Sequence, residues 1–226
     1  MNMEIFAILW PFLLFLLFVG LVVIILLYKR KRARERTEQI RAIAPMLGWQ
    51  FLETAPFNWI PNLDKFSLFT SGHTKSIRNM LYGEANGIKA ALFDYEYVVG
   101  SGKNRSTCNQ SVAYFEPRDL RVPFFSLRPE SAFHKLATVF GYQDIDFGNR
   151  PLFSSKYLLR GADEQAIRNT FTDAVLTFYE ANQGLATDAG GNQLFVFRSG
   201  HRAAPHELQG FMNSVLPLAN LLARHW

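Results

Sequence analysis

The beginning of the chain carries its longest apolar segment. From Ile5 to Tyr28 the side chains are apolar almost without a break. A bilayer hydrocarbon core of about 30 Å needs roughly 20 helical residues, so this segment can span it with modest tilt. A cleaved signal peptide would show a basic start, a shorter apolar run and small residues at its cleavage site, and the sequence has none of these. The pattern predicts an uncleaved transmembrane anchor over residues 1–28.

Apolar residues at helical spacing continue beyond this anchor. Ile40, Ile43, Ala44 and Leu47 fall on one side of a helix, and Gly48 ends it. We predict a basic juxtamembrane helix and connector over residues 29–48. This helix either continues the membrane helix or restarts after it, and it serves as a plain connector or lies flat on the membrane surface.

A three-stranded antiparallel meander is the clearest element of the remaining chain. The β-rich runs 77–84 and 88–99 flank Asn86-Gly87, a pair that tolerates positive φ at both positions of a tight hairpin turn. A Gly-rich loop over residues 100–106 then leads to a third run over residues 107–116. The middle strand alternates with a period of two. It places aromatic residues on one face (Phe93, Tyr95, Tyr97) and increasingly acidic ones on the other (Leu92, Asp94, Glu96).

Further strands and helices alternate along the rest of the chain. We expect strands over residues 49–53, 123–128 and 156–160, a second hairpin over residues 185–199, and helices that begin at Ser131, Asp163 and Pro205. The fold class predicted is α+β: one N-terminal transmembrane helix, followed by a mainly antiparallel sheet with two or three packed helices. Residues 49–226 are predicted to form one cytoplasmic α+β domain.

The positive charge of the chain is concentrated next to the anchor. The chain has a net charge of +5, and residues 29–36 alone contribute +5, because six cations there accompany only Glu35. Residues 37–226 are nearly neutral at +1, and this argues against a nucleic-acid partner. The excess of Lys and Arg after the span places the C-terminal side in the cytoplasm. The candidate membrane-surface residues are Lys29, Arg30, Lys31, Arg32, Arg34 and Arg36. They act either as topology determinants alone or by specific attraction to anionic headgroups.

Candidate chemistry in the domain is weakly marked. Asp144 and Asp146 alternate on a short extended segment and can share one face, as acid–base chemistry would require, although paired acids are more typical of the solvated face of a sheet. Arg160 precedes a helix start and could attract an anion there. These three residues form the weak candidate site of a membrane-tethered enzyme.

Other motifs give no catalytic, cofactor or metal assignment. The segment Gly100-Ser101-Gly102-Lys103 lacks the remaining residues of a phosphate-binding loop. The lone Cys108 cannot form an internal disulfide, and it is more typical of an inert thiol than of a nucleophile. His201 and His206 have no nearby partner at metal-ligand spacing.

Two blocks of the chain resemble a known group of proteins. The first is Phe93-Asp94-Tyr95-Glu96-Tyr97 with Gly100-Ser101-Gly102-Lys103 and Gln110-Ser111-Val112, and the second runs from Gly141 to Gly161 and on to Asp163-Glu164. Over residues 45–200 the chain resembles an uncharacterised family of bacterial membrane-anchored proteins with a cytoplasmic domain of unknown function. The resemblance implies a bacterial inner-membrane setting.

The sequence therefore favours a single-pass inner-membrane protein whose N-terminus lies outside the cytoplasm. Its cytoplasmic domain is predicted to be a binding or assembly module for a protein or lipid partner close to anionic headgroups. The alternatives are a hydrolase-like enzyme with a site near Asp144, Asp146 and Arg160, and an accessory subunit of a membrane complex.

Overall fold

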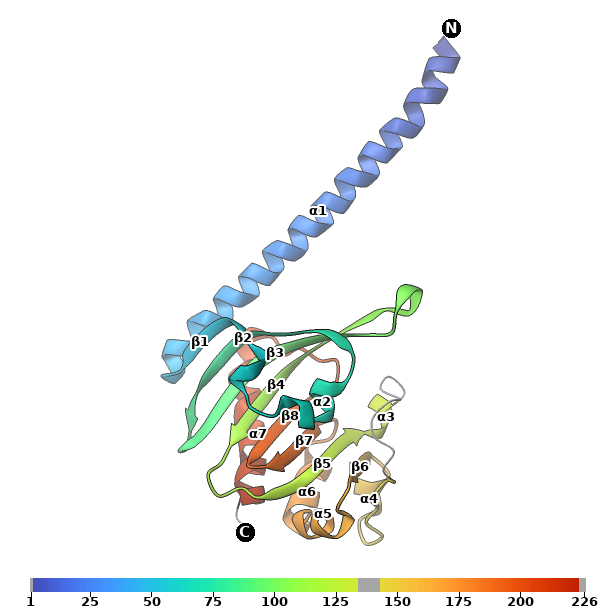
Figure 1. Cartoon of the computed structure of the whole chain (residues 1–226). Helices are drawn as coiled ribbons and strands as arrows, with labels where there is room; N and C mark the ends of the chain where they lie inside the picture. Colours follow the sequence, from blue (N-terminus) through green and yellow to red (C-terminus); the bar gives the residue numbers. More distant parts are fainter. Residues whose placement is uncertain (1, 134–142, 224–226) are drawn as a thin grey trace.

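A computed structural model describes residues 2–133 and 143–223. Helix α1 (Asn2–Leu47) extends away from the folded domain as one continuous helix, and only its C-terminal turns contact the sheet (Figure 1). Within it lies one segment long and apolar enough to cross a membrane, and none of that apolar window is buried. Gly48 ends the helix with a φ of 66°. The juxtamembrane residues thus continue the first helix rather than restart a second one.

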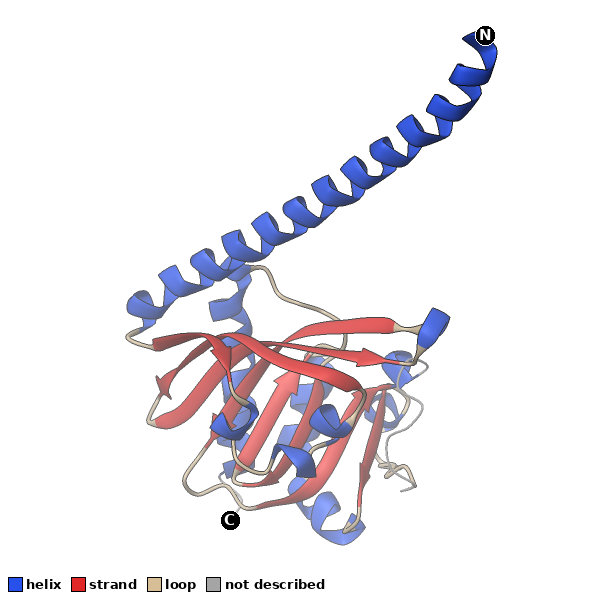
Figure 2. Ribbon diagram, turned by 45° about the horizontal axis from the view of Figure 1, so that its top comes forward, coloured by secondary structure: helices blue, strands red, loops and turns tan. Residues whose placement is uncertain are grey.

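Eight strands form one antiparallel sheet (Figure 2). Their order across the sheet is β1-β2-β3-β4-β8-β7-β5-β6. The strands are β1 (Gln50–Ala55), β2 (His73–Ala85), β3 (Ile88–Val99), β4 (Ser106–Glu116), β5 (Val122–Pro129), β6 (Tyr157–Gly161), β7 (Ala186–Gly191) and β8 (Gln193–Phe197). The predicted α+β class with a mainly antiparallel sheet is confirmed.

The β2–β3 turn follows the sequence closely. Asn86 and Gly87 have φ angles of 52° and 76°, so both turn residues are left-handed, as a two-residue hairpin turn requires. Strand β4 pairs with β3 along its whole length, from Val99 opposite Ser106 to Lys89 opposite Glu116. The segment between them includes the 3-10 turn η3 (Gly102–Asn104) and leads into a strand, so it is a hairpin connection.

One face of the sheet is covered by helices. Helices α5 (Glu164–Thr170), α6 (Asp173–Ala181) and α7 (Leu208–Ala223) pack here, together with the last turns of α1. The short elements α3 (Glu130–Phe133), α4 (Pro151–Ser154) and η4 (Pro205–Glu207) complete the helical part. Residues from distant parts of the chain are fully buried together, including Leu127, Val175, Val196 and Val215.

The opposite face is covered by residues 56–72, which we call the aromatic strap. The strap contains η1 (Phe57–Trp59), η2 (Leu63–Lys65) and α2 (Ser67–Thr70). Phe66 and Phe69 of the strap contact Phe195 edge-to-face, with ring centroids 4.7 and 5.0 Å apart. The aromatic side of β3 therefore lies in a second core rather than in solvent.

Two predicted helices differ from expectation. The helix that begins after Asp163 is broken into α5 and α6, because Phe171 leaves the helical region and Thr172 adopts the extended conformation that starts a new helix. The helix expected from Ser131 is described only as α3, and residues 134–142, over which it was expected to continue, lie outside the described residues.

Candidate functional site

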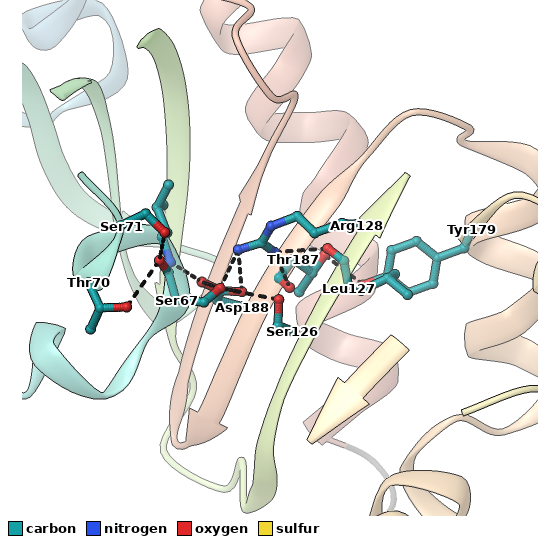
Figure 3. Close-up of polar contacts among 10 residues, drawn as sticks. Ser67, Thr70, Ser71, Ser126, Leu127, Arg128, Tyr179, Thr187 and Asp188 are labelled. Atoms are coloured by element: carbon teal, nitrogen blue, oxygen red, sulfur yellow. Dashed lines mark hydrogen bonds and ion pairs between the residues drawn. The ribbon is translucent and has the colours of Figure 1, made fainter. Parts of the chain in front are cut away.

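A buried polar cluster joins the aromatic strap to the sheet. Ser67 begins α2, Arg128 lies on β5, and Asp188 lies on the neighbouring strand β7. One guanidinium nitrogen of Arg128 lies 2.7 Å from a carboxylate oxygen of Asp188 and donates to the Ser67 hydroxyl at 2.6 Å. The two charged side chains are 8% and 1% exposed. Figure 3 shows the three side chains converging between α2 and the two strands.

Further hydrogen bonds complete this cluster. Asp188 accepts the backbone N–H of Leu68 at 2.6 Å and the hydroxyl of Ser67 at 2.9 Å. Arg128 also donates to the backbone carbonyls of Leu127 and Thr187, at 2.9 and 3.0 Å. Removing a charged pair from water is costly unless such bonds replace its hydration, and here they do. The cluster holds the strap in place, and its charged groups are already engaged with one another.

A cavity of about 190 Å³ opens beside this cluster. Its wall includes the hydroxyl-bearing residues Ser67 and Ser126, and two cationic residues, Lys65 and Arg160. Phe124 is 46% exposed, which is high for a large apolar residue in this domain. The lining residues are Lys65, Phe66, Ser67, Phe124, Phe125, Ser126, Arg160, Gly161, Ala162 and Ala189. Aromatic walls and two cations suit a small anionic group carried on an apolar body.

Close packing shapes this cavity. Gly190 lies beneath Phe124, and a Cβ at this position would overlap the Phe124 ring. The same ring lies 5.6 Å from Phe66, and the Lys65 ammonium lies 5.9 Å from its centroid. The glycine thus lets the aromatic ring lie flat against β7 and form one wall of the cavity.

A second buried ion pair docks helix α1 on the sheet. The Arg36 guanidinium donates two hydrogen bonds of 2.7 Å to the two carboxylate oxygens of Asp94 on β3. Asp94 also accepts from Asn79 at 2.9 Å and from Ser111 at 3.1 Å, and Thr37 donates to the Asn79 side chain at 2.9 Å. Bidentate pairing fixes orientation as well as distance. The helix that leaves the domain is therefore held in one direction.

The basic residues after the apolar segment are divided by this docking. Lys29, Arg30, Lys31, Arg32 and Arg34 are exposed on α1. Arg36, which the sequence groups with these membrane-surface cations, instead turns into the domain, and its side chain is 12% exposed. Its partner Asp94 is likewise buried rather than on a solvated acidic face, because Arg36, Asn79 and Ser111 supply donors.

The three residues of the weak candidate site lie near the edge strand β6. The Asp144 carboxylate accepts the backbone N–H of Leu159 at 2.7 Å, and burial raises the pKa of this carboxyl, with Asp146 adding to the rise and Arg160 opposing it. Asp146 is exposed, whereas Arg160 lines the cavity described above. Asp144 thus satisfies a backbone N–H group at the edge of β6, and neither Asp144 nor Asp146 lines the cavity.

The other candidate residues are spread over the domain. Cys108 lies on β4 as a free, half-buried thiol. His201 lines a separate cavity of about 280 Å³ with Arg198, Glu207 and Ser214, and His206 lies in η4. No group of three or more metal-ligating side chains occurs among residues 2–133 and 143–223.

Sequence reasoning missed the members of the two buried clusters. Ser67 and Asp188 are 121 residues apart, and their meeting is a property of the fold. The available signal was a charge within each strand: Arg128 lies between Leu127 and Pro129, and Asp188 between Thr187 and Ala189. A charge at such a position is rarely left unpaired in a sheet covered on both faces.

Comparison with known proteins shows a fold relationship. No protein-family model and no curated protein sequence matches this chain. The crystal structure of the mycobacterial trehalose monomycolate transport factor A, TtfA, is similar with a TM-score of 0.60 and 11% sequence identity. The similarity covers 84% of this chain and 95% of that chain. The α+β domain described here therefore has the same overall fold as the mycobacterial transport factor.

Proposed function

We propose that this chain is a single-pass inner-membrane protein whose cytoplasmic domain is a binding or assembly module for a protein or lipid partner. The observation that carries the proposal is the union of anchor and domain in one continuous helix, fixed to the sheet by the Arg36–Asp94 pair. A domain that moved freely about the end of its helix would not need such a buried ion pair. This one is held at a constant height and orientation, as a module that presents a surface beside a bilayer requires.

Orientation follows from charge. The exposed cations Lys29 to Arg34 come directly after the apolar segment, and Lys and Arg flanking a span are retained on the cytoplasmic side. The similarity to a protein described as a transport factor is compatible with a binding role, since transport requires binding. Membership of the uncharacterised bacterial family remains part of the same proposal.

Within this function, the cavity beside Phe124 is the place where we expect the partner to insert an anionic group. Lys65 and Arg160 at its wall supply the complementary charge, and the rings of Phe66 and Phe124 supply apolar contact. The Arg128–Asp188 pair below it is internally neutral and keeps the strap, and with it the cavity wall, in place.

Two experiments test the proposal. A reporter that is active only in the cytoplasm, fused after Trp226, should be active in bacterial cells, and the protein should remain in the membrane after alkaline extraction. Activity of a periplasmic reporter at the same position would overturn the proposed orientation.

Affinity purification of crosslinked full-length protein from native membranes tests the partner. Wild type should recover a protein or lipid that Phe124→Ser recovers much less. Leu152→Ser is the matched control, because Leu152 is 48% exposed and does not line the cavity. Recovery that is equal in all three proteins would remove the cavity from the proposal, and recovery of no partner by wild type would contradict the binding role.

A further inference from the structure

The direction of α1 relative to the sheet can be determined from its contacts. Arg36 meets Asp94 on β3, while Trp49, just beyond the helix, packs on Gly83 and donates to the carbonyl of Glu84 at 3.0 Å. Gly83 pairs with Ala90 of β3. The direction along α1 from its C-terminal end to its apolar end is therefore the same as the direction along β3 from Ala90 to Asp94. Both point toward the connection between β3 and β4.

The hairpin formed by β3 and β4 extends far enough to reach the bilayer. Arg36 comes eight positions after Tyr28, the end of the apolar segment, which is about 12 Å of helix at a rise of about 1.5 Å per residue. From Asp94 to Val99, five further strand residues extend about 17 Å at about 3.4 Å each, before the turn begins. The strand segment is therefore longer than the helix segment that it must match, and the residues of the turn add to its length.

Two views agree with this reach. In Figure 1 and in Figure 2 the tip of the β3–β4 hairpin projects beyond the body of the sheet, on the side from which α1 leaves the domain. The opposite end of the same two strands, where Lys89 pairs with Glu116, faces away from α1's apolar part.

The chemistry of this tip suits an anionic surface. Residues 101–107 are exposed, and they include Lys103 and Arg105. The sequence has no acidic residue between Glu96 and Glu116. At the base of the tip, the His73 ring nitrogen Nε2 lies 3.0 Å from the carbonyl of Gly100, which ties the connection to β2. The tip thus presents cations without a compensating carboxylate.

We propose that the tip of the β3–β4 hairpin is a second membrane contact, in which Lys103 and Arg105 bind anionic lipid headgroups of the bilayer that α1 spans. This inference rests on the proposed function, because it requires α1 to be in the membrane. Together with the exposed cations of α1, the tip supports the domain at two separated points. A domain held in this way cannot rotate about the helix axis, and it keeps one side toward the lipid.

Fluorescence of a labelled tip tests this contact in the full-length chain. Cys108→Ser removes the one native thiol, and Asn104→Cys then carries an environment-sensitive dye at the tip. The protein is reconstituted in phosphatidylcholine vesicles with or without phosphatidylglycerol, and a nitroxide on the lipid headgroup serves as quencher. We expect quenching of the tip dye in the anionic vesicles, and loss of most of it in high salt, which screens exposed charges. A dye at Asn169→Cys, an exposed position in α5, should be quenched little in either vesicle.

Charge reversal separates a specific contact from general attraction. Lys103→Glu with Arg105→Glu should abolish the quenching at position 104. The matched control, Lys89→Glu with Arg118→Glu, changes the charge equally at the opposite end of the hairpin and should leave the quenching unchanged. Equal loss in both variants, or a tip dye that stays as exposed as the dye at position 169, would overturn the proposed contact.

Co-flotation distinguishes this failure from failure of the proposed function. If the chain floats with the vesicles but its tip remains exposed, anchoring stands and the second contact falls. If the chain does not associate stably with either kind of vesicle, the membrane-anchored function itself is contradicted.

Discussion

Arg36 and Arg128 each meet a strand aspartate at 2.7 Å, yet the two pairs join different parts of the molecule. Arg128–Asp188 lies under the aromatic strap, between adjacent strands of one sheet. Arg36–Asp94 lies on the other face and connects helix α1 to the sheet. The first pair stabilises the interior of the domain, whereas the second fixes the orientation of the domain relative to helix α1.

The two pairs also differ in how deeply they are buried. Asp188 is 1% exposed, and its partner Arg128 also lies over the Phe197 ring at 4.9 Å. Asp94 is 8% exposed and Arg36 is 12% exposed, so the second pair is less deeply buried than Arg128 and Asp188, at 8% and 1%. The cost of leaving a charge unpaired rises with burial, and we therefore expect the two pairs to respond unequally to the loss of one partner.

The largest effect is expected from Asp188→Ala. This change leaves the Arg128 guanidinium buried without its carboxylate and removes the acceptor of the Leu68 N–H, at a cost of about 3–5 kcal/mol. The measurement is denaturant unfolding of the full chain in mild detergent, together with proteolysis in residues 56–72, where cleavage should become faster. Ser126→Ala is the control, because its hydroxyl lies 3.2 Å from Ser67 and contacts neither charge in a hydrogen bond. Unfolding equal to wild type would show that the pair does not secure the strap.

A smaller effect is expected from Arg36→Ala. Asp94 keeps its donors Asn79 and Ser111, and it is less deeply buried than Asp188, so we expect a loss of about 2 kcal/mol. The domain should remain folded, because Ile40 and Ala44 still bury their side chains against it. Hydrogen exchange should instead become faster in residues 36–47. Arg34→Ala, an exposed change on the same helix, should alter neither property. Exchange equal to wild type in Arg36→Ala would contradict a role of the pair in fixing the helix.

The comparison also explains which features could be predicted from the sequence. Local chemistry is sufficient for the Asn86-Gly87 turn, the strands around it and the apolar segment, because each depends on neighbouring residues. The aromatic strap could not be predicted in this way, since its short turns gain their stability from contacts with Phe195 and Asp188, far along the chain. The break between α5 and α6 has a similar origin, because Phe171 is placed by packing on Phe125 at 5.0 Å.

The two ion pairs were hidden for the same reason, and the Arg36 pair, like the strand charges Arg128 and Asp188, left a readable signal. Arg36, Ile40 and Ala44 are spaced by four residues and share one helix face, and two of the three are typical core residues. A cation on that stripe indicates a buried partner rather than a membrane surface. The partner, Asp94, lies 58 residues away along the chain, and its identity follows only from the fold.

The smallest effect on stability is expected at a third carboxylate, Asp144, which has no arginine pair of this kind. It accepts one strand-edge N–H, from Leu159, and burial raises its pKa, so ionisation is disfavoured in the folded domain. Between the ordinary aspartate pKa near 4 and the raised value, the folded state retains a proton that the unfolded chain has released, and the free energy of unfolding falls as pH rises through this window.

Asp144→Asn keeps an acceptor for Leu159 and removes the ionisation. We expect its stability relative to wild type to be higher at pH 7 than at pH 3, by less than about 1 kcal/mol, in parallel denaturant titrations. A relative stability of Asp144→Asn that falls from pH 3 to pH 7 would mean that the charged carboxylate is stabilised at this edge.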